Sequence, residues 1–135
     1  MIQVMFDHII KVAFVVPDVA EAVRFYTEKL DLEVEARFPS GAGPGEDFVF
    51  LKSKTSSIEL MPEKAMAGAP IGFHHVAFLV DDVDKRLQEL RDRNVKITAE
   101  AFDAGIGGIR LGDFEGPGNL LHRLFTSDPH KRESD

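Results

Sequence analysis

The sequence predicts an α+β fold in which two tandem βαβββ modules form a curved mixed sheet, with a concave cleft on one face and the helices outside. The first observation is an internal repeat. KVAFVVPDV at residues 11–19 recurs 64 residues later as HVAFLVDDV at residues 75–83, with six of nine positions identical. The second is an amphipathic helical stretch after each copy, and the third is a set of three strand-like segments after each helix. Since one module alone would leave its sheet face uncovered, we expect the two to share a surface that holds a ligand cleft.

The helical stretches have clear start signals. The first runs from about Val19 to Leu30, where Asp18 is the expected N-cap and Glu21 completes a capping-box pattern. In the second stretch Asp82 is the expected N-cap and Asn94 a plausible stop. Apolar residues recur at helical spacing in both stretches: Val19, Ala22, Val23, Tyr26 and Leu30 in the first, and Val83, Leu87 and Leu90 in the second.

The strand-like segments follow at roughly 33–38, 48–52 and 56–61 in the first half and 96–102, 108–113 and 119–125 in the second. The last segments also match, because SSIEL (56–60) aligns with NLLHR (119–123) at a spacing of 63 residues. We therefore expect a single domain over residues 1–126, built from modules at about 9–64 and 72–126. A polar C-terminal tail over residues 127–135 completes the chain.

Two glycine-rich loops interrupt the strands, PSGAGPG at residues 39–45 and GIGG at residues 105–108. Neither opens a helix or is followed by the Lys-Ser/Thr of a phosphate-binding loop. They are interpreted as flexible connections, with a lid over the cleft as the alternative.

Composition excludes several classes of function. The 135 residues include no cysteine, so disulfides, zinc–thiolate sites and thiol nucleophiles are excluded. The net charge of −7, dispersed along the chain, argues against nucleic acid and anionic membranes as partners. No apolar run is long enough to span a membrane, and the N-terminus does not read as a signal peptide. We expect a soluble, cytoplasmic protein with a small-molecule partner.

Strand alternation sorts the polar side chains. His75 shares a face with Ala77 and Leu79, opposite a larger apolar set that should pack under the helix, so His75 is expected to face the cleft. By the repeat, Lys11 takes the same place in the first half. In the last strands, Glu59 lies between two helix-facing apolar residues, and the alignment makes His122 its equivalent. Arg123 then fits poorly on the helix-facing surface, except by snorkelling at a sheet edge.

The four positions expected to converge are therefore Lys11, Glu59, His75 and His122. Two imidazoles and a carboxylate among them suit a divalent metal of the iron, manganese, nickel, zinc or cobalt kind. His8 and His74 have the wrong strand parity to join them, unless a bulge redirects His8.

The motifs VAFVVPDVAEAVRFYTEKLDLEVE, SIELM, HHVAFLVDD and GPGNLLHRLF resemble the vicinal-oxygen-chelate superfamily over residues 11–125. This superfamily includes glyoxalase I, methylmalonyl-CoA epimerase, extradiol dioxygenases and bleomycin-resistance proteins. The pattern is most similar to the glyoxalase and epimerase branch. The resemblance implies paired βαβββ modules, a homodimer, and a metal held from the first and last strands of each module. Carried over by position, the ligands are Glu59, His75 and His122, with Lys11 and Glu59 as catalytic residues. Two positions depart from the family pattern, because Lys11 stands where His is usual and His122 where Glu is usual.

Two interpretations of Lys11 stay open. Either three ligands hold a metal and Lys11 acts as base or oxyanion partner, or Lys11 takes the place of the metal and pairs with Glu59. The leading functional hypothesis is a metal-dependent lyase, isomerase or dioxygenase that acts on a small oxygen-chelating substrate. The alternative is a metal-free protein that binds a drug or metabolite in a cleft lined by phenylalanines: Phe48, Phe50, Phe102 and Phe114.

Overall fold

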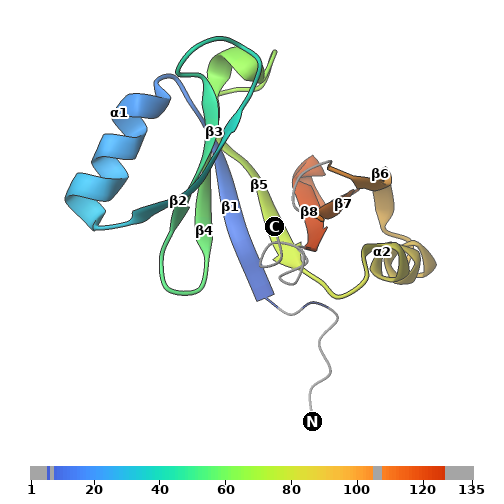
Figure 1. Ribbon diagram of the computed structural model, residues 1–135. Helices are drawn as coiled ribbons and strands as arrows, with labels where there is room; N and C mark the ends of the chain where they lie inside the picture. Colours follow the sequence, from blue (N-terminus) through green and yellow to red (C-terminus); the bar gives the residue numbers. More distant parts are fainter. Residues whose placement is uncertain (1–5, 7, 105–107, 127–135) are drawn as a thin grey trace. The chain divides into compact units, whose positions relative to one another are not determined.

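The computed structural model describes Phe6, residues 8–104 and residues 108–126. The chain divides into two compact units (Figure 1). One holds residues 10–75, and the other holds residues 76–135 together with residues 1–9. The predicted polar tail at 127–135 lies outside the described residues, as do residues 105–107 of the second glycine-rich loop.

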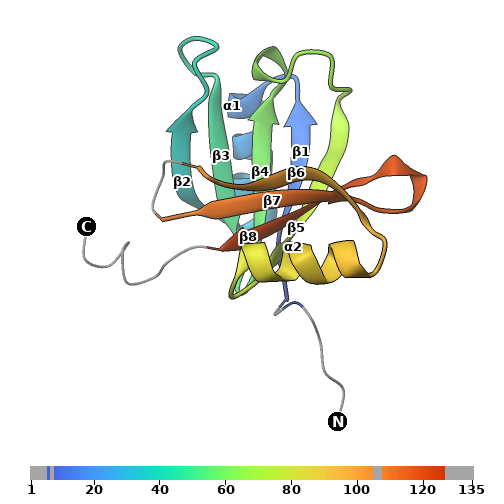
Figure 2. The same ribbon diagram turned by 90° about the vertical axis from the view of Figure 1, so that its right-hand side faces the viewer.

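The first unit contains the sheet order β2-β3-β4-β1. Strand β1 is parallel to β4, whereas the β2–β3 and β3–β4 pairs are antiparallel. The helix between β1 and β2 covers one face of this sheet (Figure 2). The elements of the unit are β1 (His8–Val16), α1 (Val19–Arg24), β2 (Glu33–Pro39), β3 (Asp47–Lys52), β4 (Ser57–Pro62) and a 3₁₀ turn at Glu63–Ala65.

The first helix begins as predicted, with the Asp18 carboxylate accepting a hydrogen bond from the Glu21 backbone N–H at 3.0 Å. It does not continue as one α-helix to Leu30. After Arg24 the chain forms a π-helix over Phe25–Lys29. The wider turn of a π-helix changes the direction in which later side chains leave the axis. Leu30, expected on the buried stripe, is accordingly 51% exposed.

The core of the first unit lies between α1 and one face of its sheet. Val19 and Val23 of the helix pack against Leu51 and Leu60 of the sheet. A separate cluster of Ala13, Val15 and Met61 lies on strand positions that alternate with the helix-facing ones. The two faces of the sheet are therefore fixed by side-chain alternation, and residues such as Leu60 identify the face toward the helix.

Strand β5 (Gly72–Leu79) begins in the first unit and ends in the second, whose sheet order is β5-β8-β7-β6 with antiparallel β7–β8 and β6–β7 pairs. The Asp82 carboxylate caps its helix by accepting from the Lys85 N–H at 3.0 Å. Asn94, which follows the helix, has a left-handed φ of 64°, as expected of a stop residue. The elements are β5 (Gly72–Leu79), α2 (Val83–Asp92), β6 (Lys96–Asp103), β7 (Arg110–Glu115), a 3₁₀ turn at Pro117–Asn119 and β8 (Leu121–Thr126).

The core of the second unit lies between α2 and one face of β7 and β8. Val83 and Leu87 of the helix pack with Phe114 and Leu124. Gly112 lies directly under the helix, because a Cβ atom there would lie 2.6 Å from Leu87 Cδ1. Gly112, Phe114 and Leu124 therefore mark the helix-facing side of these two strands.

The α+β class and the βαβββ order of each half are thus confirmed, and the predicted single domain over residues 1–126 stays a prediction. In the described part of the chain, no helix has the length and apolar character needed to cross a membrane.

Candidate functional site

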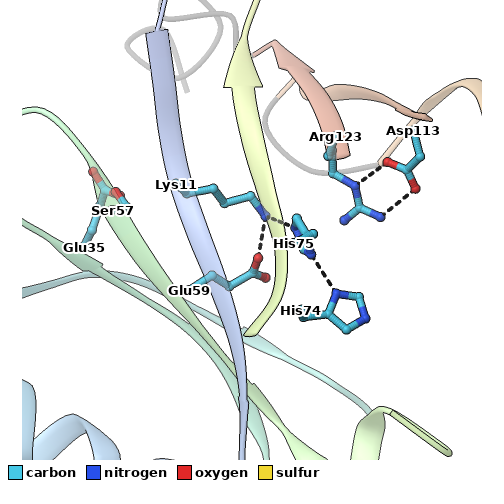
Figure 3. A network of polar contacts seen from close by, with 8 residues as sticks. All are labelled: Lys11, Glu35, Ser57, Glu59, His74, His75, Asp113 and Arg123. Carbon is cyan, nitrogen blue, oxygen red and sulfur yellow. Dashed lines mark hydrogen bonds and ion pairs between the residues drawn. The ribbon is translucent and has the colours of Figure 1, made fainter. Parts of the chain in front are cut away.

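Three of the predicted residues meet in the first unit: Lys11 on β1, Glu59 on β4 and His75 on β5 (Figure 3). The ammonium of Lys11 forms a buried ion pair with the Glu59 carboxylate. Its Nζ also lies 3.3 Å from Nε2 of His75. Lys11 is 4% exposed, Glu59 8% and His75 fully buried. Ionisable side chains that are this deeply buried require partners, and the three residues of the cluster pair with one another.

Local strand geometry brings these side chains together. On β1, Lys11 shares a face with the buried residues Ala13 and Val15, and this face points away from α1. Ala13 is the register partner of Glu59 on the parallel neighbour β4, and Glu59 is itself opposite Phe50 on β3. The Lys11 Nζ lies 5.3 Å from the centre of the Phe50 ring, a cation–π distance. The predicted cleft-side placement of Lys11 and Glu59 within this unit follows from strand alternation alone.

His74 extends this cluster, although its strand parity predicts the opposite face from His75. The Nδ1 atoms of His74 and His75 lie 2.7 Å apart. An ammonium only donates hydrogen bonds, so His75 Nε2 accepts from Lys11 and the His75 imidazole carries its proton on Nδ1. From there it donates to His74. The hydrogen bonds thus run in one direction, from Lys11 through His75 to His74, and they fix the tautomer and orientation of the buried ring.

The fourth predicted residue, His122, has different surroundings in the second unit. Its ring stacks on Phe114 with centroids 5.0 Å apart and lies parallel to Phe78 at 6.2 Å. Its Nδ1 lies 3.0 Å from the Leu120 carbonyl oxygen. Gly116 leaves room for the ring, since a Cβ there would lie 2.5 Å from His122 Cε1. His122 is packed as an aromatic residue among phenylalanines.

The register of β7 and β8 explains this placement. The cross-strand partner of His122 is Phe114, which belongs to the core under α2, and the next pair along the strands is Asp113 with Arg123. His122 therefore lies on the helix-facing side, and Arg123 lies on the opposite side. The equivalence of His122 with Glu59, predicted from the alignment of SSIEL with NLLHR, is wrong by one residue. A one-residue slip moves every side chain of a strand to the other face.

Arg123 is instead the counterpart of Glu59, 64 residues along the chain, the same spacing that separates Lys11 from His75. It forms a bidentate pair with its cross-strand neighbour, with Nε 2.7 Å from Asp113 Oδ1 and a terminal nitrogen 3.0 Å from Oδ2. Asp113 is buried. Neither the place of Arg123 on the sheet face away from the helix nor its pairing with Asp113 was predicted from the sequence. The available signal was the poor fit of an arginine to a helix-facing position.

The remaining predicted residues lie apart from this cluster or support it. His8 is exposed at the start of β1. Phe48 packs against the cluster of Ala13, Val15 and Met61, whereas Phe102 is 45% exposed. Phe114 belongs to the core under α2 and so does not line the face that carries Arg123.

The arrangement around Lys11 bears directly on the predicted metal. A divalent ion held by this unit would use a carboxylate oxygen of Glu59 and the lone pair of His75 Nε2. Both atoms already accept a hydrogen bond from the Lys11 ammonium. This arrangement therefore does not fit a metal ion bound between Glu59 and His75. Within each unit, the described residues also group no three histidine, cysteine, aspartate or glutamate side chains that could hold a metal. The ligand role of His122 stays a prediction.

Each unit carries its helix on one sheet face and polar residues on the other, with the order βαβββ in both halves. These features define the class of paired βαβββ proteins. The model of the Glyoxalase/Bleomycin resistance protein/Dioxygenase superfamily matches residues 6–122, and the chain belongs to this superfamily.

Solved structures agree with this fold. Methylmalonyl-CoA epimerase from Mycobacterium tuberculosis is 20% identical, with a TM-score of 0.80 over 98% of this chain and 96% of that chain. A variant of Streptomyces coelicolor methylmalonyl-CoA epimerase in complex with 2-nitronate-propionyl-CoA is 23% identical, with a TM-score of 0.75 over 92% and 96%. A hypothetical protein from Bacillus halodurans is 20% identical, with a TM-score of 0.73 over 89% and 94%. No curated protein sequence matches significantly.

Proposed function

We propose that this chain is an enzyme of the isomerase or lyase kind, which moves a proton at a carbon next to a carbonyl group in a small substrate with two neighbouring oxygen atoms. The observation that carries the proposal is the buried group of Lys11, Glu59 and His75. A carboxylate and an ammonium held together away from water supply the two parts that such a reaction needs, a base and a partner for the oxyanion.

The roles follow from the chemistry of each side chain. The Glu59 carboxylate accepts the proton when the C–H bond breaks, and the bonding electrons move onto the carbonyl oxygen to form an enolate. The Lys11 ammonium donates a hydrogen bond to that oxygen, where negative charge develops. Glu59 then returns the proton to carbon. His75, fixed by His74, keeps the Lys11 Nζ oriented without itself exchanging a proton.

The similar epimerases suggest where to look for substrates. One was solved with methylmalonyl-CoA and NH₄⁺. A first panel therefore contains methylmalonyl-CoA and, separately, small 2-oxo acids, which also present two neighbouring oxygens. The divalent metal predicted from the family resemblance is treated as a variable in the assay, with each substrate tested with and without added metal.

The experiment follows exchange of the substrate C–H proton in D₂O by NMR. We expect exchange with at least one member of the panel and a loss of about 10²- to 10⁴-fold in Glu59→Gln, because the amide cannot act as a base. The exposed residue Glu33 on β2 provides the control, and Glu33→Gln should exchange at the wild-type rate. Exchange that persists in Glu59→Gln contradicts the proposal, as does the absence of exchange across the panel.

A second candidate is a binding protein without turnover. It is favoured by the apolar surroundings of the charged group, since Phe50 lies against Lys11 and Phe48 packs against a neighbouring apolar cluster on the same sheet. Stoichiometric binding of a panel compound by calorimetry, with no proton exchange, distinguishes this function from the first.

A further inference from the structure

We propose that the Lys11 ammonium is the resident cation of this site: it takes the place between Glu59 and His75 that a divalent ion would need, so the protein works without a metal. The proposal concerns cation binding and does not depend on the substrate. It stands whether the chain is an enzyme or a binding protein.

The Lys11 Nζ contacts the Glu59 carboxylate and lies 3.3 Å from His75 Nε2, so one atom engages both donors at once. The aromatic face of Phe50 at 5.3 Å adds a third group suited to a cation. His75 is turned so that Nε2 presents its lone pair to Lys11, because its Nδ1 proton is donated to His74. This is the orientation that a metal-bound imidazole also needs.

The structure places Arg123, not His122, at the position equivalent to Glu59. Arginine stays protonated and has no lone pair for a metal. Within the second unit, the position equivalent to Glu59 therefore offers no metal ligand. Arg123 is paired with the Asp113 carboxylate of its own unit, as Lys11 is paired with Glu59 in the first unit.

A single substitution at Lys11 should therefore allow this site to bind a divalent metal. Lys11→His removes the positive charge, frees the Glu59 oxygen and His75 Nε2, and adds a third donor of a type that divalent metals accept. Lys11→Ala frees the same two donors without adding a third. The matched control is Lys52→His, which adds a histidine at an exposed position on β3.

The experiment is a titration of each metal-stripped protein with Co²⁺, read by the visible absorption of the bound ion and by metal content after dialysis. We expect no retained metal in the wild type or in Lys52→His, and one Co²⁺ per chain in Lys11→His. For Lys11→Ala we expect binding at least about tenfold tighter than in the wild type. Circular dichroism and thermal unfolding establish that each variant is folded, and Lys11→Ala decides the question if Lys11→His does not fold.

Stoichiometric Co²⁺ in the wild type that is lost in Glu59→Gln would overturn the proposal. A folded Lys11→His that binds no better than Lys52→His would overturn it as well, since Lys11 would then not occupy a cation position. Neither result depends on proton exchange, so failure here is distinguishable from failure of the proposed function.

Discussion

Arg123 of β8 occupies in the second half the position that Glu59 of β4 occupies in the first. The two residues follow the same alternation, on the sheet face away from the helix. A carboxylate in one half is thus replaced by a guanidinium in the other. Each residue forms an ion pair with a residue of opposite charge, Glu59 with Lys11 and Arg123 with Asp113. The internal repeat preserves the position and reverses the sign of the charge.

Removal of Arg123 should destabilise the protein strongly. Arg123→Ala leaves Asp113 buried without a partner, and the expected loss is about 3–5 kcal/mol in the free energy of unfolding measured in urea. The double variant Asp113→Leu with Arg123→Leu should recover most of the lost free energy of unfolding.

The matched control for this experiment is the exposed pair of Arg91 with Glu100, in which one guanidinium nitrogen contacts both carboxylate oxygens. Arg91→Ala should cost less than about 1 kcal/mol, because water screens the charges and solvates the carboxylate that remains. Equal losses in Arg91→Ala and Arg123→Ala would show that burial of Asp113 has no energetic consequence.

The Lys11–Glu59 pair should behave as a coupled unit. Lys11→Met leaves a buried carboxylate and should lower the free energy of unfolding by about 3–5 kcal/mol at neutral pH. The double variant Lys11→Met with Glu59→Leu should be more stable than either single variant. The pair of Lys64 with Glu46, in which Lys64 is exposed, serves as the reference, and Lys64→Met should change stability little. Additive losses in the double variant would contradict the coupling.

His122 should tolerate replacement by another aromatic ring. His122→Phe keeps the stack with Phe78 and Phe114, so we expect a free energy of unfolding within about 1.5 kcal/mol of the wild type. We also expect unchanged proton exchange or ligand binding, because the ring lies on the helix-facing side. His75→Phe is the comparison and should abolish activity. A His122→Phe variant that folds normally but loses more than tenfold in activity would show that His122 belongs to the functional site.

Gly112 should be sensitive to a single methyl group. In Gly112→Ala the new Cβ meets Leu87 Cδ1 at 2.6 Å and Val83 Cγ1 at 3.1 Å, so the helix or these side chains must shift. We expect a loss of about 1–3 kcal/mol by thermal or urea unfolding. Leu87→Ala in the same chain should remove the clash, so the two substitutions together should cost less than the sum of their separate effects. A strictly additive result contradicts the close packing of α2 on β7.

The Asp84–Arg110 pair predicts a small dependence of stability on pH. The hydrogen bond from Arg110 is the main cause that holds the pKa of Asp84 below its usual value. A carboxyl group whose pKa is lowered on folding contributes stability above its unfolded pKa, and the contribution is lost as pH falls through the folded pKa. Arg110→Gln should therefore lower the melting temperature slightly at pH 7, and the two proteins should converge at acid pH, once the pH has fallen below the lowered pKa of Asp84. A gap between the two proteins that persists at low pH points to packing of Arg110 as its cause.

The sequence predicted the elements of the fold well because each leaves a local signal. The caps at Asp18 and Asp82 and the stop at Asn94 depend on neighbouring residues only. The π-helical turn after Arg24 has no comparable signal, since a helix with one wider turn keeps nearly the same pattern of apolar residues. The sheet face on which Lys11 lies could be predicted because side-chain alternation along one strand decides it.

The register of β8 could not be predicted in the same way. Leu120, Leu121 and Leu124 surround His122 and Arg123, so the apolar pattern of this segment is compatible with either face toward the helix. Which face of β8 lies toward the helix depends on the side chains of β7 that pair with His122 and Arg123. Phe114 provides an aromatic stack for His122, and Asp113 provides a counter-charge for Arg123. These partners become neighbours only when the two strands pair.

The sequence by itself determined the duplication, the order of strands and helices in each half, and the polar identity of the site positions in the first half. All of these depend on local periodicity and on comparison of the chain with itself. Only the tertiary structure decided that Lys11 binds both Glu59 and His75, that His74 supports His75, and that Arg123 is the counterpart of Glu59. The physical reason is that pairing of buried charges and strand register depend on residues far apart in the chain. One residue of register is enough to exchange a histidine for an arginine on the sheet face away from the helix.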